Sequence, residues 1–347
     1  MQAAAAGGRR IGTAVVGCGP WGRNLVRTLA AQPGCDLRVV CDLDPERLAH
    51  VSERFPRPRT TTDFADVLAD DEVEAVLIAT SSASHHALAL AALRSGRATY
   101  VEKPLALCER DAAELVALAD ARGLTLMVGH LMLHHPAVLH LSDLVARGEL
   151  GDLLYAYSQR VNLGVVRRDE NALWSFGPHD VSVMDHLMGG APETVSARGQ
   201  AYLQPGVEDV VFLDLRYPGG RLAHVQLSWL DPHKLRRTTV VGSRKMAVFD
   251  DMEPAEKIRI YDKGAERSTD YATFGEYLGV RHGDVLVPRV PATEPLAAEV
   301  AHFVACVRDG TRPRTDGRNG LEVVRVLAAA SRSLSRGGLP EPVGAAQ

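Results

Sequence analysis

The sequence predicts an α/β protein with two domains. The first domain is expected to hold a doubly wound parallel sheet, and the second is expected to be an α/β domain with an open, mostly antiparallel sheet. Three observations support this prediction. Short apolar strands alternate with helical patterns in the first third of the chain, strands follow one another from about residue 130, and 347 residues suit two domains of ordinary size.

The first domain is expected to span residues 10–130. Its strands are short runs of apolar, mostly β-branched or leucine residues, which is typical of strands buried on both faces of a sheet. Helical patterns lie between them, and this alternation predicts parallel strands joined by right-handed crossovers. The predicted strands are 11–16, 37–41, 75–79, 98–102 and 125–128, and the predicted helices are 21–31, 45–54, 85–95 and 109–122.

The second domain is expected to span residues 131–336, with two closing helices that are able to pack back on the first domain. Pro218–Gly220 predicts a hairpin turn. Residues 223–229 alternate between apolar and polar types, which predicts a sheet with one buried face, and the tail at 339–347 is expected to be loose. The predicted strands are 153–161, 194–203, 209–217, 221–230, 238–241 and 257–261, and the closing helices are 295–309 and 321–334.

The composition limits the class of protein. Hydrophobic residues make up 46% and charged residues 24%, which argues against disordered, collagen-like and disulfide-scaffold proteins. A net charge of −4 gives no electrostatic reason to expect a nucleic acid or an anionic membrane as partner. The five cysteines are scattered without a CxxC pair, and the chain shows neither a signal-peptide pattern nor a membrane-length apolar run. We expect a cytoplasmic protein.

The strongest local signal is GCGPWG at residues 17–22. It follows a predicted strand, opens a predicted helix and is followed by Asp42 at the end of the next strand, which is the context of a dinucleotide-binding motif. Gly17 permits the tight turn, Gly19 lets the main chain approach a pyrophosphate, and Gly22 lets the helix pack on the strand. The helix N-terminus offers unpaired N–H groups to the phosphates.

Asp42 favours NAD over NADP. A carboxylate accepts hydrogen bonds from ribose hydroxyls and repels a 2′-phosphate, and Leu43 beside it supplies no cation. Pro20 and Trp21 lie within the same loop, where Trp21 has two open roles, shielding the pyrophosphate or packing the first helix. The alternative for the whole motif is a glycine turn in an α/β protein that binds no nucleotide.

The tripeptide Glu102-Lys103-Pro104 directly follows the fifth predicted strand. Ligands of doubly wound sheets bind outside the carboxyl ends of the strands, so Lys103 is expected at the nicotinamide end of the cofactor. An ammonium donates to a carbinol oxygen, and its pKa shifts on burial more readily than that of a guanidinium. Pro104 restricts Lys103 to an extended conformation. From position alone, a surface lysine that ends a strand is an equally good interpretation.

Pro178 and His179 mark the predicted start of a helix that ends near Gly189. His179 would then lie in the first turn, where the positive end of the helix lowers the imidazole pKa and leaves a neutral ring that accepts a proton. The alternative is a histidine or aspartate that only caps the helix. Trp174 and Phe176, which precede this helix, are expected in the core, and the alternative is that they flank a ligand.

The histidines do not predict a metal site. The chain has 13 of them, and His130, His134 and His135 fall at helical spacing. A zinc site needs a further ligand that the sequence does not identify. We therefore expect no metal.

Together these motifs resemble the Gfo/Idh/MocA oxidoreductases, which include glucose-fructose oxidoreductase and inositol dehydrogenase. The resemblance runs from about residue 11 to 334, and the EKP motif after its strand is its most specific part. It implies a Rossmann domain that binds NAD and a second domain that binds substrate and often forms the oligomer interface. The matching segments are GCGPWGRN, the acid at Asp42, IATSSASHHALALAALRSGRATYVEKPLA, VGHLMLHHPAV and the PHD helix start.

The resemblance also implies roles for single residues. In the family, the EKP lysine and a histidine of the second domain flank the reacting carbon, which here implies Lys103 and His179 as the catalytic pair. Glu102, Thr80 and His85 match positions near the nicotinamide end of the cofactor.

One position departs from the family pattern. The usual DxGxH motif has an aspartate four residues before the histidine, where this chain has Ser175, and a serine cannot supply that negative charge. Asp180, directly after His179, is a candidate replacement. Arg168, Asn171, Ser175 and Asp180 are the expected contacts to a polyhydroxylated substrate.

The implied reaction is hydride transfer between the nicotinamide and a secondary hydroxyl or ketone. His179 would take the hydroxyl proton while Lys103 hydrogen-bonds the same oxygen. The segment DENALWSFGPHDVSVMDHL most resembles relatives that act on nucleotide-linked sugars, often at carbon 3, which favours a hexose unit of a nucleotide sugar or glycoside. The alternatives are a cyclitol or free-monosaccharide dehydrogenase, a redox-neutral NAD-dependent glycosidase and a non-catalytic NAD-binding sensor. The open sheet predicts a homodimer or homotetramer.

Overall fold

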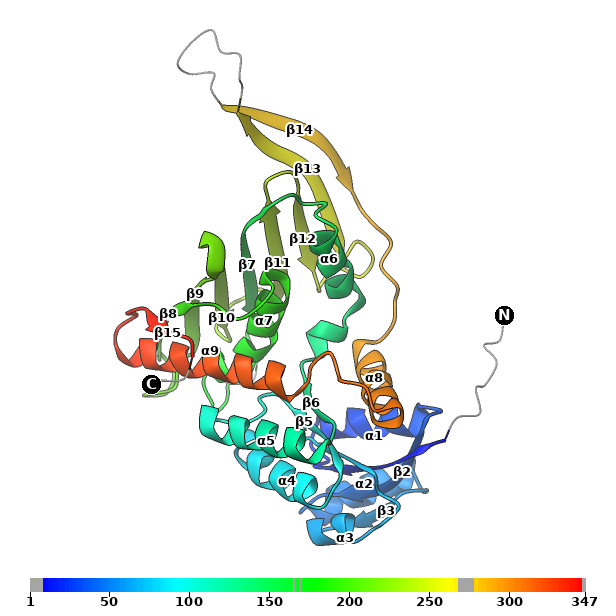
Figure 1. Cartoon of the computed structure of the whole chain (residues 1–347). Coiled ribbons are helices and arrows are strands. Elements are labelled where there is room, and N and C mark those ends of the chain that lie inside the picture. The colour runs from blue at the N-terminus through cyan, green and yellow to red at the C-terminus, as the bar shows by residue number, and fades with distance from the viewer. Residues whose placement is uncertain (1–8, 165, 169, 268–277, 345–347) are drawn as a thin grey trace, which may run out of the picture. The chain divides into compact units, whose positions relative to one another are not determined.

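The computed structural model describes residues 9–164, 166–168, 170–267 and 278–344 (Figure 1). The chain divides into two compact units. The first comprises Met1–His134 and Glu294–Val324, and the second comprises His135–Thr293 and Arg325–Gln347. Within the described residues, no helix is long and apolar enough to cross a membrane.

The first unit is built on a six-stranded sheet in the order β3-β2-β1-β4-β5-β6. All neighbouring strands run parallel, which confirms the predicted doubly wound sheet. Every residue of β1, β4, β5 and β6 is buried, as expected when helices cover both faces. The strands are β1 (Ile11–Val16), β2 (Cys35–Cys41), β3 (Arg59–Thr61), β4 (Ala75–Ile78), β5 (Ala98–Glu102) and β6 (Leu126–Gly129).

Helices cover this sheet on two sides. The strand order runs in opposite directions from β1, so right-handed crossovers place α1 and α4 on opposite faces. On the α1 face, Leu25 and Leu29 of α1 share one core with Val300 and Phe303 of α8. On the other face, α4 and α5 pack against each other. The helices of this unit are α1 (Gly22–Ala31), α2 (Pro45–Arg54), α3 (Phe64–Leu68), α4 (Ser82–Arg94), α5 (Glu109–Arg122), the 3₁₀ turn η1 (Leu131–His134) and α8 (Pro295–Asp309).

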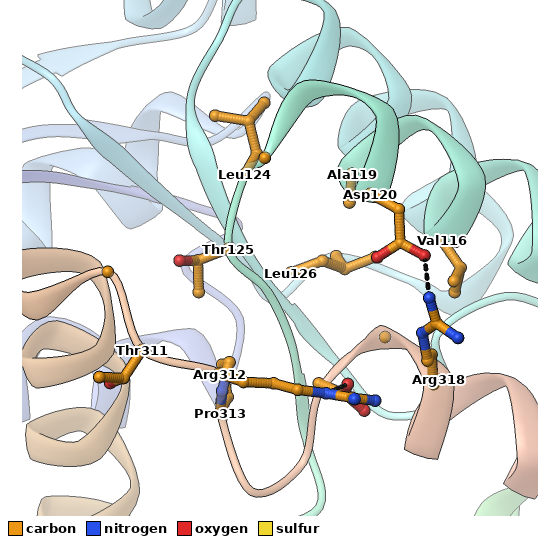
Figure 2. A pocket seen from close by; sticks show the side chains of 14 residues that line it. Val116, Ala119, Asp120, Leu124, Thr125, Leu126, Thr311, Arg312, Pro313 and Arg318 are labelled. Carbon is orange, nitrogen blue, oxygen red and sulfur yellow. Dashed lines mark hydrogen bonds and ion pairs between the residues drawn. The ribbon is translucent and has the colours of Figure 1, made fainter.

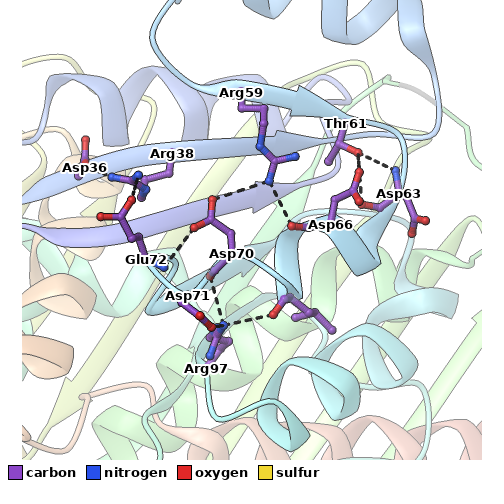
Figure 3. A network of polar contacts seen from close by, with 11 residues as sticks. Asp36, Arg38, Arg59, Thr61, Asp63, Asp66, Asp70, Asp71, Glu72 and Arg97 are labelled. Atoms are coloured by element: carbon purple, nitrogen blue, oxygen red, sulfur yellow. Dashed lines mark hydrogen bonds and ion pairs between the residues drawn. The ribbon is translucent and has the colours of Figure 1, made fainter.

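The edge strand β3 and the short α3 were not predicted, and polar side chains hold them in place (Figure 3). Arg59 donates to the carbonyl of Asp66 at 3.1 Å and lies 3.7 Å from the carboxylate of Asp70. Thr61 Oγ1 donates to the Asp66 carboxylate at 2.6 Å, and Arg97 donates to the carbonyl of Asp70 at 3.2 Å. Hydrophobic periodicity does not reveal an edge that depends on such contacts.

The second unit contains a nine-stranded sheet in the order β14-β13-β12-β11-β7-β10-β9-β8-β15. Among the strands that the structure describes in this unit, only β7 and β10 pair in parallel, so the prediction of a mostly antiparallel sheet is confirmed. The turn Pro218–Gly220 joins β9 to β10, as predicted. The strands are β7 (Leu153–Val161), β8 (Thr194–Gln200), β9 (Val210–Arg216), β10 (Leu222–Ser228), β11 (Leu235–Gly242), β12 (Met246–Asp250), β13 (Ile258–Arg267), β14 (Leu278–Leu286) and β15 (Glu341–Pro342).

Helices α6 (Pro136–Ala146) and α7 (Ala172–Met188) cover one face of this sheet. α7 packs on β7, β9 and β10, and α6 packs on β12. A Cβ at Gly177 would lie 2.9 Å from Leu327 of α9 (Gly317–Ser335) and 3.5 Å from Leu227 of β10, so glycine permits this close packing of α7. The first turns of α9, up to Val324, belong to the first unit.

The predicted start of α7 at Pro178 is wrong. The helix begins at Ala172, and Asn171 caps it by accepting a hydrogen bond from the N–H of Trp174 at 3.1 Å. Asn171 also donates to Glu208 at 2.6 Å, which fixes the cap. Pro178 therefore lies inside the helix, and His179 lies in its middle. His179 is therefore outside the first turn, to which the electrostatic effect of a helix N-terminus is confined.

The tail was predicted to be loose, and this is wrong for its first part. β15 pairs with β8, and Glu341 is buried beside Arg332 and Arg336. Residues 345–347 lie outside the described residues. The pairing went unpredicted because a two-residue strand carries no periodic pattern.

Candidate active site

The glycine turn after β1 admits no side chain at two of its positions. Gly17 has a φ of +94°, and a Cβ there would lie 2.7 Å from the carbonyl carbon of Ala79. A Cβ at Gly22 would lie 1.8 Å from the carbonyl oxygen of Gly17. At Gly19 the nearest atom is Nη1 of Arg47, 3.9 Å away. Gly17 and Gly22 are thus required by the fold, whereas Gly19 leaves the main chain of the turn open to a ligand.

Asp42 links the end of β2 to this turn. Its side chain is 7% exposed, and it accepts hydrogen bonds from the N–H of Cys18 and, at 2.9 Å, from the N–H of Asp44. The guanidinium of Arg47 lies 3.7 Å from Asp42 and 3.2 Å from Asp44. The sequence-based prediction considered only Leu43 as a neighbour of Asp42 and missed Arg47, which is the third residue of α2.

Trp21 connects the glycine turn to the end of β5. Its indole N–H donates to the carboxylate of Glu102, while 39% of the residue stays exposed. This contact was not foreseen, since the sequence offered only a choice between shielding a pyrophosphate and packing α1. Pro20, beside it, accepts a hydrogen bond from Asn24 on its carbonyl at 3.2 Å.

Glu102 ends β5 and is 8% exposed. Besides Trp21, it accepts hydrogen bonds from the Tyr100 hydroxyl at 2.9 Å and from the N–H of Lys103 at 3.3 Å. Burial raises the pKa of Glu102, and these donors together with the charge of Lys103 oppose that rise. The bond from Lys103 to Pro104 is cis, so the chain turns sharply after the strand.

His85 ties this turn to the loop after β4. It is 1% exposed, with Nδ1 2.8 Å from the carbonyl of Pro104 and Nε2 3.3 Å from the carbonyl of Thr80. Burial lowers the pKa of His85, and the charge of Lys103 adds to this effect. Burial likewise lowers the pKa of His130 to about 4, again with a contribution from Lys103. Lys103 therefore lies within electrostatic reach of two neutral imidazoles.

These predicted residues of the first unit gather at one edge of the sheet. The glycine turn directly follows β1, and Asp42 directly follows β2. Thr80 lies two residues after the end of β4, and Lys103 directly follows β5. In open α/β sheets this edge, where the strand order reverses, is where ligands bind. The glycine cradle and the buried acidic acceptor at Asp42 fit a dinucleotide.

The second unit carries the remaining predicted residues on or before α7. His179 is half-buried, and Ser175 lies one turn earlier on the same helix. Asp180 is 4% exposed and forms an ion pair with Arg160 of β7, so the predicted replacement charge is already engaged. Asn171 is engaged as the helix cap.

Arg168 is exposed and belongs to the segment that precedes α7. Among the described residues, no three histidine, cysteine, aspartate or glutamate side chains converge as they would around a metal ion.

A separate hollow of the first unit has a volume of about 250 Å³ and contains none of the predicted residues (Figure 2). It lies between α5, the start of β6 and the loop before α9. Asp120 pairs with Arg318 at 2.6 Å, and Asp316 pairs with Arg312. Its charges are thus balanced within the hollow.

Comparison with known proteins identifies the family. Residues 11–130 match the family model of oxidoreductases with an NAD-binding Rossmann fold, and residues 138–248 match the GFO/IDH/MocA C-terminal domain. The chain belongs to the Gfo/Idh/MocA family. Its cofactor is therefore NAD, as predicted from Asp42 and the glycine motif.

Solved structures of other proteins resemble nearly the whole chain. An oxidoreductase from Magnetospirillum magnetotacticum MS-1 is 33% identical, with 92% of this chain and 99% of its own covered at a TM-score of 0.79. GenD2 from gentamicin A biosynthesis, solved in complex with NAD, is 26% identical, with 97% of each chain covered at a TM-score of 0.81.

Among curated sequences, D-apiose dehydrogenase from Paraburkholderia graminis is 25% identical over 95% of this chain and 89% of its own. The chain spans 60% of the length of two other curated relatives.

The glycines at 19 and 22 should respond differently to alanine. Gly22→Ala places a Cβ against the Gly17 carbonyl, so we expect a clear fall in the thermal unfolding midpoint. Gly19→Ala leaves the fold intact but obstructs the approach of a pyrophosphate, so we expect an unchanged midpoint and NAD affinity about tenfold lower. Calorimetric titration with NAD measures the second effect. Unchanged NAD affinity in Gly19→Ala would contradict the assignment of this turn.

Proposed function

We propose that this Gfo/Idh/MocA protein is an NAD-dependent oxidoreductase that acts on a secondary hydroxyl of a hexose unit, at carbon 3, in a nucleotide sugar or a glycoside. One observation carries the proposal. Lys103 follows β5 at the sheet edge that also holds the glycine turn and Asp42. The lysine side chain is therefore at the same edge as the residues that fit a dinucleotide. The names of the relatives support a sugar substrate, since one is a D-apiose dehydrogenase and another serves gentamicin A biosynthesis.

In the proposed reaction, bound NAD supplies the hydride acceptor at C4 of its nicotinamide ring. Gly19 would let the main chain of the turn approach its pyrophosphate, while Gly17 and Gly22 shape the turn and Pro20 and Trp21 lie in the same loop. Asp42 would hold its adenosine ribose. Thr80, His85, Glu102 and Lys103 would surround its nicotinamide end.

Lys103 and His179 divide the proton work in this proposal. Lys103 donates a hydrogen bond to the substrate oxygen and stabilises its developing negative charge. His179 removes the hydroxyl proton, and in the reverse direction it returns that proton. The charge of Lys103 is one of the influences that lower the pKa of Glu102 against the rise caused by burial, so the two side chains attract each other as cation and anion.

The proposed substrate contacts come from α7 and from the segment before it. Arg168 and Ser175 remain candidates, whereas Asn171 and Asp180 act in the fold as cap and ion-pair partner. Ser175 stands where the family motif has an aspartate, so position 175 supplies no negative charge one turn before His179. A proton taken up by His179 is therefore not passed to a carboxylate at position 175.

Lys103→Ala and His179→Ala test these roles. We expect each variant to lose turnover by about 100-fold or more, because general acid–base partners act on the reacting oxygen. His179→Ala should also keep its NAD affinity, because His179 is not among the proposed cofactor contacts. Absorbance of reduced nicotinamide with a panel of nucleotide sugars, glycosides and cyclitols measures turnover. Lys234→Ala, at an exposed lysine, is the matched control and should retain activity.

Two results would contradict the proposal. Turnover of a glycoside without accumulation of reduced cofactor would favour a redox-neutral glycosidase. Full activity in Lys103→Ala would remove the lysine from the chemistry and favour another site.

We also propose that the open face of the second unit binds a second copy of the chain. Tyr155, Tyr157, Phe212 and Leu222 are 38–48% exposed on three adjacent strands. The two tyrosines and Leu222 line a hollow of about 530 Å³. Apolar faces of this kind are usually covered by another protein surface, and identical faces pair readily about a twofold axis.

The mass of the protein in solution tests this proposal. We expect a dimer or tetramer, and we expect the double variant Tyr155→Asp, Tyr157→Asp to become a monomer because it places charge in the apolar face. Tyr202→Asp, at a tyrosine that is 70% exposed in a loop of the same unit, should leave the mass unchanged. A monomeric wild type would contradict the proposal.

A further inference from the structure

A buried chain of three side chains stands behind Lys103 in the first unit. Tyr100 Oη lies 2.9 Å from Oε1 of Glu102 and 3.1 Å from Oε2 of Glu299. Tyr100 and Glu299 are 0% exposed, and Glu102 is 8% exposed. Two carboxyl groups thus face one hydroxyl in an environment that contains little water.

α8 delivers Glu299 to this position. Glu299 and Phe303 are four residues apart on α8 and therefore share a face of the helix. Phe303 packs edge-on against the ring of Tyr100 at 5.8 Å, while Glu299 contacts its hydroxyl. On the other side, a Cβ at Gly129 of β6 would lie 2.5 Å from the Tyr100 hydroxyl, so glycine leaves room for the group.

The hydroxyl of Tyr100 and the carboxyl groups of Glu102 and Glu299 need one more proton than the hydroxyl supplies. A tyrosine hydroxyl has one proton and can donate to only one carboxylate. The second contact becomes a hydrogen bond only if the other carboxyl group is protonated and donates to the tyrosine oxygen. Two buried carboxylates that both contact the Tyr100 hydroxyl would also repel each other, which favours retention of one proton on the pair.

The surroundings decide which carboxyl group carries the proton. Glu102 faces three donors, the indole of Trp21, the hydroxyl of Tyr100 and the N–H of Lys103, which stabilise its anionic form. Glu299 has the Tyr100 contact alone, and among the described residues its Oε1 meets no hydrogen-bond partner. Burial and the charge of Glu102 raise the pKa of Glu299 well above its usual value.

We propose that Glu299 is a positioning residue that stays protonated, donates to Tyr100, and through it holds Glu102 as the anion that joins Trp21 of the glycine turn to Lys103. Glu299 touches neither cofactor nor substrate. Its effect on the site passes through the Glu102 carboxylate, which orients the turn after β5 by accepting from the N–H of Lys103. The inference rests on the proposed function only for the role of Lys103.

Infrared spectroscopy of the whole protein tests the proton directly. At neutral pH, the difference spectrum of wild type minus Glu299→Gln should show the C=O stretch of a protonated carboxylic acid. Tyr100→Phe should shift that band, because the acid loses its hydrogen-bond acceptor. Glu294→Gln, at an exposed glutamate beside the start of the same helix, is the control and should leave the band unchanged. Absence of the band in wild type would overturn the proposal.

NAD affinity of the same variants tests the positioning. A glutamine amide is neutral and can donate to Tyr100, so Glu299→Gln should keep NAD affinity within about threefold of wild type. Glu299→Leu cannot donate, and we expect its NAD affinity to fall about tenfold, the usual effect of one lost buried hydrogen bond. Calorimetric titration measures both, and thermal unfolding shows that each variant is folded.

Two outcomes would overturn the positioning role. Equal losses in Glu299→Gln and Glu299→Leu would show that a charge at 299 is needed. Wild-type NAD affinity in Glu299→Leu would show that the contact to Tyr100 has no effect on the site. Neither experiment uses a sugar substrate. The infrared spectrum and the NAD titration therefore still test the role of Glu299 if the proposed sugar oxidation is not observed.

Discussion

The carboxylate of Glu102 joins segments of the first unit that are far apart in the sequence. It accepts hydrogen bonds from Trp21 in the glycine turn, from Tyr100 in β5 and from the main chain of Lys103. A buried anion is stable only when such donors surround it, so the three segments must meet for the charge to be tolerated. The same constraint gives the lysine a fixed main-chain position at the carboxyl edge of the sheet.

The fold of the first unit could be predicted because its information is local. β1, β4, β5 and β6 are buried at every residue, so their apolar runs are visible in the sequence. The glycine turn is equally local, since Gly17 and Gly22 are required by the main chain next to them. Elements without a buried pattern escaped prediction: β3 depends on polar contacts, and the described side chains of β14 are almost all exposed.

The parts of the site that escaped prediction depend on contacts between distant residues. Glu299 reaches Tyr100 across 199 residues of sequence, and nothing in the pattern of α8 marks one glutamate for burial. α7 was placed too late because Pro178 favours a first turn, whereas the Asn171 cap, fixed by Glu208, sets the start. The ion pair of Asp180 with Arg160 likewise requires the packing of α7 on β7 to be known.

A crystal structure of the protein with NAD tests most directly whether this sheet edge is the cofactor site. We expect the pyrophosphate against the main chain of residues 17–22, the adenosine ribose at Asp42 and the nicotinamide end toward Lys103. A dinucleotide bound at another edge of the sheet, or with its ribose away from Asp42, would contradict the roles assigned to the glycine turn and to Lys103.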